Sequence, residues 1–137
     1  MAVESWDPSG ARTGLTTDRL DRLLQASRLL DEPRFGLDIQ STGELAPLAR
    51  HSARSRQGVD WAKAGENLSD DEVIALIRLF TLAESAFSGW EAGDASPVIP
   101  LAALLKRRGS YPTDLTAWIR TNSDNRFLPY GNLMDRL

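Results

Sequence analysis

The chain has 137 residues, of which 42% are hydrophobic and 26% are charged, and its formal net charge is −3 at pH 7. These values are ordinary for one globular domain and exclude a wholly disordered chain, while the weak negative charge is atypical of nucleic-acid binders, whose affinity comes from neutralising phosphates. Cysteine is absent, which excludes disulfides, thiol nucleophiles and cysteine-based zinc sites.

The sequence favours a cytoplasmic protein with no membrane contact. Met1 to Gly10 contains neither the basic region nor the apolar region of a signal peptide. The longest apolar stretch, residues 73–83, is too short to cross a bilayer and contains Arg78. The lack of cysteine fits a reducing compartment.

The N-terminal part predicts a flexible segment followed by a helix. Residues 1–14 contain proline and several glycines and are expected to be a flexible N-terminal segment, ahead of a single helical domain at 15–137. The first helix is expected to begin near Thr16, a capping residue, and to end before Pro33. Its apolar face is formed by Leu20, Leu23, Leu24, Ser27 and Leu30.

Residues 34–40 alternate in the manner of a strand, with Phe35, Leu37 and Ile39 on one side. No partner strand is evident in the sequence. Two interpretations stay open: an extended loop that lies on the core, or an edge that pairs with another chain. A homodimer is therefore also left open.

Residues 42–67 have the least regular pattern. A short helix is expected within 44–55, with Pro47 tolerated only in its first turn. A further turn is expected at 59–64, where it would present Trp61.

The clearest predicted element is a helix over residues 70–88. Ser69 and Glu72 have the spacing of a capping box, in which each side chain accepts from the backbone N–H of the other residue. The helix is apolar nearly all round, apart from a narrow polar strip at Arg78, Thr81 and Ser85. Such a helix is expected at the centre of a domain, with neighbours on most sides.

Two shorter helices are predicted towards the C-terminus. Ser96 is expected to cap a helix that runs to Arg108 and stops at Gly109. A final helix is expected over residues 112–121, followed by a tail at 126–137 with several apolar anchors. The predicted fold is therefore a mainly α, single-domain bundle of four to five helices.

The sequence offers no convincing catalytic constellation, and we expect a protein that is not an enzyme and needs no cofactor. His51 is the only histidine, and a neighbouring Ser52 does not by itself provide catalytic geometry. A metal site would have to use oxygen ligands alone. Asp124, with Asn122 and Asn125, lacks the spacing of a calcium loop, so no metal site is predicted.

One carboxylate stands out because Glu84 lies on the apolar face of the predicted central helix. A buried acid must be paired or have a raised pKa, and such groups sometimes mark active sites. The structural interpretation is favoured, with Trp90 or an arginine as the partner of the carboxylate.

The segment from Arg50 to Arg56 has the strongest functional pattern. Its basic side chains would recognise phosphate or an acidic partner; alternatively, the segment would be a solvated loop or would form salt bridges to acidic residues nearby. The first interpretation leads to the main hypothesis, a non-enzymatic interaction or regulatory module that binds a protein partner through a local basic surface. The residues expected to bind the partner are Arg50, His51, Arg54 and Arg56.

The alternative hypothesis is a DNA- or RNA-binding regulator. The predicted helices on either side of Gly109 have the proportions of a helix–turn–helix pair, and basic residues cluster in that half. Against it, many helical hairpins share this spacing and bind no DNA. The candidate nucleic-acid contacts are Lys106, Arg107, Arg108, Thr113, Thr116, Arg120 and Arg126.

Overall fold

The computed structural model describes residues 17–30, 39–51, 58–125 and 128. Three short 3-10 helices lie between the α-helices: η2 (Ala46–Leu48), η3 (Gly65–Asn67) and η4 (Gly93–Ala95). The α-helices of the described residues are α2 (Thr17–Ser27), α3 (Ile39–Leu45), α4 (Trp61–Ala64), α5 (Asp70–Ala86), α6 (Val98–Arg108) and α7 (Leu115–Asn122). The predicted mainly α-helical bundle is confirmed.

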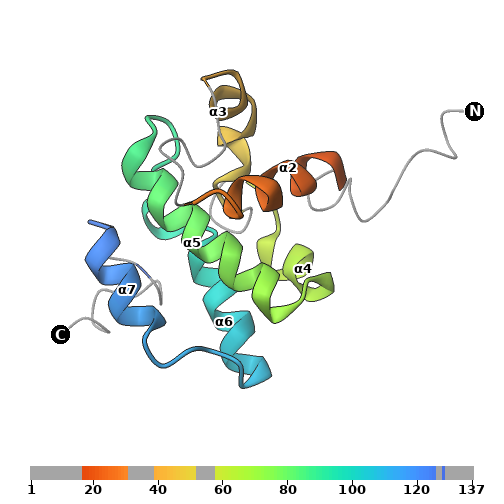
Figure 1. Cartoon of the computed structure of the whole chain (residues 1–137), viewed down its shortest axis with the longest axis vertical. Coiled ribbons are helices and arrows are strands. Elements are labelled where there is room, and N and C mark those ends of the chain that lie inside the picture. The colour runs from red at the N-terminus through yellow and green to blue at the C-terminus, as the bar shows by residue number, and fades with distance from the viewer. Residues whose placement is uncertain (1–16, 31–38, 52–57, 126–127, 129–137) are drawn as a thin grey trace, which may run out of the picture.

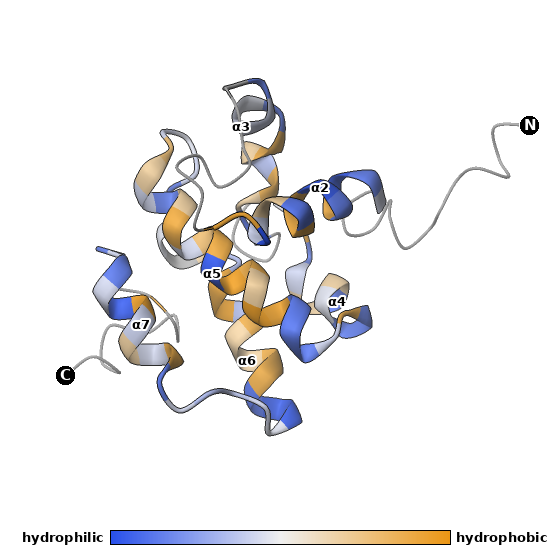
Figure 2. Cartoon of the chain, in the orientation of Figure 1, coloured by the Kyte–Doolittle hydropathy of each residue, from blue (hydrophilic) through white to orange (hydrophobic). Residues whose placement is uncertain are grey.

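Helix α5 is the central element of the bundle. It packs against α2, α6 and α7, which surround it in Figure 1. Its apolar residues face these neighbours on several sides, and the hydrophobic colour of Figure 2 is concentrated on α5 and α6. Thr81 is buried and donates to the carbonyl of Ile77, so the exposed polar strip predicted at residues 78, 81 and 85 is interrupted there.

The predicted capping box of α5 is confirmed. The Ser69 hydroxyl accepts from the Glu72 N–H at 3.1 Å, and the Glu72 carboxylate accepts from the Ser69 N–H at 2.9 Å. Helix α6 ends as predicted at Gly109, whose φ of 71° lies in the left-handed region that favours glycine. Local chemistry alone therefore determines where these two helices begin or end.

The last helix begins later than predicted. Residues 112–114 form a turn in which the Leu115 N–H donates to the Pro112 carbonyl, and α7 starts only at Leu115. The buried residues of α7 are Leu115 and Ile119, which lie one turn apart. The onset of this helix therefore follows the position of its first buried side chain and not the proline.

Two tryptophans pack against Phe80 of α5 and bond to the irregular region at residues 42–67. Trp61 and Trp90 are both fully buried, and their rings lie 5.2 Å and 6.2 Å from the ring of Phe80. The Trp61 indole N–H donates to the Leu48 carbonyl at 2.7 Å, and that of Trp90 donates to the Thr42 carbonyl at 3.1 Å. The prediction that Trp61 is presented by its turn is therefore wrong, because its ring belongs to the core.

The extended segment predicted at 34–40 does not reach residue 40, because Ile39 and Gln40 lie in α3; residues 34–38 lie outside the described residues. The helix is held by a contact distant in sequence. The Arg22 guanidinium of α2 bonds the Ser41 hydroxyl at 3.1 Å and the Glu44 carboxylate at 2.8 Å. Ser41 and Glu44 of α3 are thus joined to α2 by a tertiary contact that the local alternation does not reveal.

Two further expectations concern the two ends of the chain. Leu128, one of the predicted C-terminal anchors, is buried. The N-terminal segment 1–14 lies outside the described residues. No described helix combines the length and the hydropathy that crossing a bilayer requires.

Replacing Phe80 with alanine should lower the free energy of unfolding by about 3–5 kcal/mol, because it leaves a cavity between two tryptophan rings. Leu29→Ala is the matched control, since that side chain is 44% exposed, and it should change stability by less than about 0.5 kcal/mol. Urea denaturation of both variants measures the difference. Equal unfolding midpoints for Phe80→Ala and the wild type would contradict the central position of α5.

Candidate functional site

The basic segment that begins at Arg50 is only partly described. Arg54 and Arg56 lie outside the described residues, so their predicted role stays a prediction. Arg50 is not helical, because its carbonyl accepts from the Val59 N–H at 2.8 Å next to an isolated parallel bridge between His51 and Val59. The Arg50 guanidinium donates to the Glu91 carbonyl at 3.2 Å. Arg50 therefore joins two loops of the fold.

His51 is half-buried and supports the same turn. Its Nδ1 atom lies 3.4 Å from the Trp61 N–H and 3.3 Å from the Val59 carbonyl. One tautomer accepts from the first group and the other donates to the second. The His51 N–H donates to the Ala95 carbonyl at 2.6 Å. The backbone around His51 is thus fixed at both sides by the fold.

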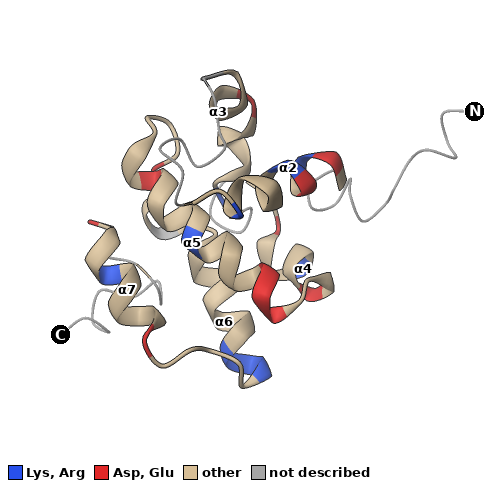
Figure 3. Ribbon diagram, in the orientation of Figure 1, with Lys and Arg blue, Asp and Glu red and all other residues tan. Residues whose placement is uncertain are grey.

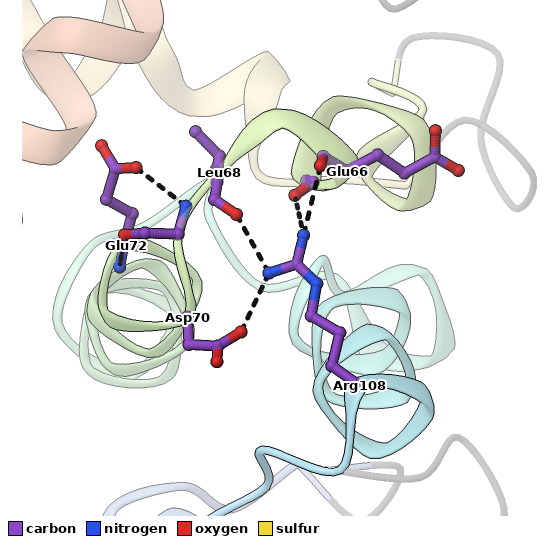
Figure 4. A network of polar contacts seen from close by, with 7 residues as sticks. Glu66, Leu68, Asp70, Glu72 and Arg108 are labelled. Atoms are coloured by element: carbon purple, nitrogen blue, oxygen red, sulfur yellow. Dashed lines mark hydrogen bonds and ion pairs between the residues drawn. The ribbon is translucent and has the colours of Figure 1, made fainter.

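Arg108 lies at the end of α6 and reaches across to the start of α5 (Figure 4). One terminal nitrogen of its guanidinium donates to the Leu68 carbonyl at 2.9 Å and to the Asp70 carboxylate at 3.0 Å. The other donates to the carbonyls of Gly65 and Glu66, both at 3.2 Å. All four terminal N–H groups thus have acceptors within the chain.

This arrangement gives Arg108 a structural role at the junction of η3, α5 and α6. The accepting carbonyls belong to residues 65, 66 and 68, and the carbonyl of Gly65 also accepts from the Leu68 N–H. Hydrogen bonds from the side chain of Ser110 and then from Arg108 hold the pKa of Asp70 below its ordinary value. A nucleic-acid contact by Arg108 would have to break this network.

Lys106 and Tyr111 form a second arrangement beside α7. The Lys106 ammonium lies 5.3 Å from the centre of the Tyr111 ring, a cation–π distance. The Tyr111 hydroxyl lies 2.8 Å from the Thr116 hydroxyl on α7. Lys106 is exposed, whereas Tyr111 and Thr116 are half-buried. These contacts join the end of α6 to one flank of α7.

Arg78 and Trp118 form the matching arrangement on α5 and α7. The Arg78 guanidinium carbon lies 5.3 Å from the centre of the Trp118 ring. Arg78 is exposed and Trp118 is half-buried. We call Arg78, Lys106, Tyr111, Trp118 and Arg120 the cation–aromatic surface; Arg120 is an exposed residue of α7.

The remaining predicted nucleic-acid contacts are placed less favourably for a helix–turn–helix. Arg107 and Thr113 are exposed, and Arg126 lies outside the described residues. The connection from Gly109 to Asp114 is longer than the roughly three- or four-residue turn of that motif. Helix α7 packs mainly on α5 and not on α6. The two helices do not form a compact pair.

Glu84 is buried, as its position on the apolar face of α5 suggested. Its carboxylate accepts from the Ser96 hydroxyl at 2.5 Å and from the Asn125 amide at 3.3 Å. Burial raises the pKa of Glu84 to about 7, although these hydrogen bonds act in the opposite direction. The partners are a serine and an asparagine, and not the tryptophan or arginine that the sequence suggested. Ser96 is fully buried and not accessible to a substrate.

Sequence reasoning missed the two cation–aromatic pairs. Tyr111 and Trp118 are seven residues apart, a helical spacing that suggests a common apolar face. Instead, Tyr111 lies before α7 and meets Lys106, five residues away, whereas Trp118 meets Arg78 of α5, a contact distant in sequence. The available signal was the group of basic residues in this half of the sequence, together with Tyr111 and Trp118, whose side chains have an apolar body and a polar tip.

Comparisons with known proteins found no matching family model, no similar curated protein and no similar solved structure. In the part of the chain that the structure describes, no three His, Asp or Glu side chains gather closely enough to hold a metal ion.

Replacing Arg108 with methionine keeps the length of the side chain but removes its donors. We expect the free energy of unfolding to fall by about 1–3 kcal/mol, because the carbonyls of residues 65–68 lose charge-assisted hydrogen bonds. Arg107→Met removes an exposed charge from the same helix and should change stability by less than about 0.5 kcal/mol. Chemical denaturation compares the two variants, and equal losses would exclude the structural role of Arg108.

Proposed function

We propose that the protein is a non-enzymatic interaction module that binds an acidic polypeptide through the cation–aromatic surface. The observation that carries this proposal is a pair of aromatic rings, Trp118 on α7 and Tyr111 bonded to Thr116 of α7, each with an exposed cation 5.3 Å from its centre. Tyrosine, tryptophan and arginine are the residues most enriched among energetically important interface positions.

Charge supports an acidic partner. Figure 3 shows Lys and Arg on α5, at the end of α6 and on α7, and acidic residues at the start of α5 and at both ends of α7. The acidic first turn of α5 contains Asp70, Asp71 and Glu72, and Asp70 pairs with Arg108 at the end of α6. The cations that carry the proposal are Arg78, Lys106 and Arg120, which are exposed. Carboxylates of a partner would meet Arg78, Lys106 and Arg120, which steers encounter and selects against basic proteins.

The aromatic rings argue for a polypeptide over a nucleic acid. Single strands are held mainly by bases that stack on open aromatic faces. In this structure Arg78 lies over the Trp118 ring and Lys106 lies over the Tyr111 ring. The side chains can contribute apolar edges and charge to a peptide without giving up these contacts.

Peptides selected from a displayed random library against the whole chain should be acidic, and their affinity should fall at high salt because the charges involved are exposed. A variant with Arg78→Gln, Lys106→Gln and Arg120→Gln should bind them about tenfold more weakly or worse, chiefly through slower association. Titration of labelled peptide, with association rates measured by stopped flow, provides both values.

The matched control removes three cations elsewhere, with Arg19→Gln, Arg28→Gln and Lys63→Gln, and should retain peptide affinity to within about twofold after correction for net charge. Equal weakening in both triple variants would show a nonspecific charge effect and would contradict the proposed surface. Tight, salt-dependent binding of mixed-sequence duplex or single-stranded DNA, lost in the first variant, would replace the peptide proposal with nucleic-acid binding.

A further inference from the structure

The exposed side of α5 carries opposite charges on either side of an apolar centre. Asp71 and Arg78 are exposed, whereas Ile74 and Ala75 between them are half-buried. An α-helix has about 3.6 residues per turn, so positions three, four and seven residues apart lie on the same side of it. We call Asp71, Ile74, Ala75 and Arg78 the α5 stripe.

The two charges of the α5 stripe lie too far apart to pair within one molecule. They are separated by about 10.5 Å along the helix axis, whereas side chains of one helix meet at spacings of three or four residues. No oppositely charged residue of α5 lies within one turn of either charge. Among the described residues neither Asp71 nor Arg78 forms an ion pair, and the Trp118 ring that Arg78 contacts brings no carboxylate.

A second copy of α5 supplies the missing partners. Consider two copies of this helix that pack antiparallel about a twofold axis between Ile74 and Ala75. Asp71 of each protomer then lies opposite the partner's Arg78, and the apolar residues meet at the centre. A parallel pair in the same position would oppose like charges. The spacing of the stripe is therefore self-complementary in the antiparallel orientation alone.

Helix α7 lies along a different part of α5 and supports the same orientation. The Trp118 ring contacts Arg78. The Ser85 hydroxyl donates to the Asn122 carbonyl at 3.4 Å, so α7 follows the second half of α5. The acidic start of α5 lies away from α7 (Figure 3). An antiparallel partner would therefore bring its acidic first turn towards the cation–aromatic surface, which contains Arg78 and Arg120.

We propose that the protein self-associates as a twofold-symmetric dimer through the α5 stripe, so that the partner is a second copy of this chain. The stripe spans about two turns of one helix, much less than a standard protein–protein interface, and its ion pairs are screened by salt. The dimer should therefore be weak, with a dissociation constant of roughly 0.1–1 mM at low salt. The proposal does not rest on peptide binding, although Arg78 belongs to both surfaces.

Sedimentation equilibrium of the full chain, from about 10 μM to about 1 mM, measures this association. It should weaken as salt rises, because the opposed charges are exposed. Asp71→Arg would oppose arginines at both ends of the contact, and Arg78→Asp would oppose aspartates. Each single variant should therefore dimerise at least about tenfold more weakly than the wild type. Circular dichroism checks that both variants stay helical.

The double variant with Asp71→Arg and Arg78→Asp tests the pairing itself. It should dimerise as tightly as the wild type, because each aspartate again meets an arginine. Mixed dimers of the double variant with the wild type should not form, since both ends of that contact would oppose like charges. A fluorescent label on one of the two proteins follows the mixed species. Mixed dimers as tight as the parent dimers would overturn the antiparallel contact.

The matched controls reverse exposed charges away from the stripe, with Asp124→Arg and Arg107→Asp. They change the net charge by the same two units and should keep self-association to within about twofold. A wild type that stays monomeric at about 1 mM would overturn the proposal, and so would single stripe variants that associate as the controls do. Asp71 lies outside the cation–aromatic surface, so Asp71→Arg should still bind acidic peptides. The dimer can thus fail while peptide binding holds, and the reverse.

Discussion

The structure depends on the burial of Phe80 between the rings of Trp61 and Trp90. Trp61 begins the four-residue helix α4 and Trp90 lies in the loop after α5, and their indole N–H groups reach backbone carbonyls of residues 48 and 42. A buried indole N–H must find an acceptor. The aromatic core therefore attaches the irregular segment at residues 42–61 to α5. Its two indole N–H groups also supply hydrogen bonds to two backbone carbonyls of that segment.

The second constraint is the position of α6 against η3. A Cβ atom at Gly65 would lie 2.8 Å from a methyl group of Leu104, so the side chains of α6 pack directly on the backbone of Gly65. Arg108 fixes the same junction by bonding the carbonyls at the end of η3. A basic residue in the last turn of a helix normally interacts with that helix's own C-terminus. Arg108 instead completes the end of a neighbouring element, which is why its charge is a poor guide to ligand binding.

The fold could be predicted where local chemistry decides the structure and not where distant contacts do. The capping box at Ser69 and the glycine stop at Gly109 need only neighbouring residues, and both were predicted from the sequence. Ile39 and Gln40 lie in a helix whose next turn is joined to α2 through Arg22, which lies in another element. The candidate surface follows the same rule. Its cations were visible in the sequence, but the contact of Arg78 with the Trp118 ring was set by the packing of α7 on α5.

Glu84 shows how burial and hydrogen bonding compete at one carboxylate. Two side-chain donors point at its oxygens, and donors of this kind favour the ionised form. Burial opposes them and has the larger effect on the pKa. The location in the last turn of α5 acts in the same direction as burial, because the C-terminal end of a helix repels negative charge. Burial and hydrogen bonding thus act against each other at the one carboxylate that joins α5 to the residue before α6 and to the segment that follows α7.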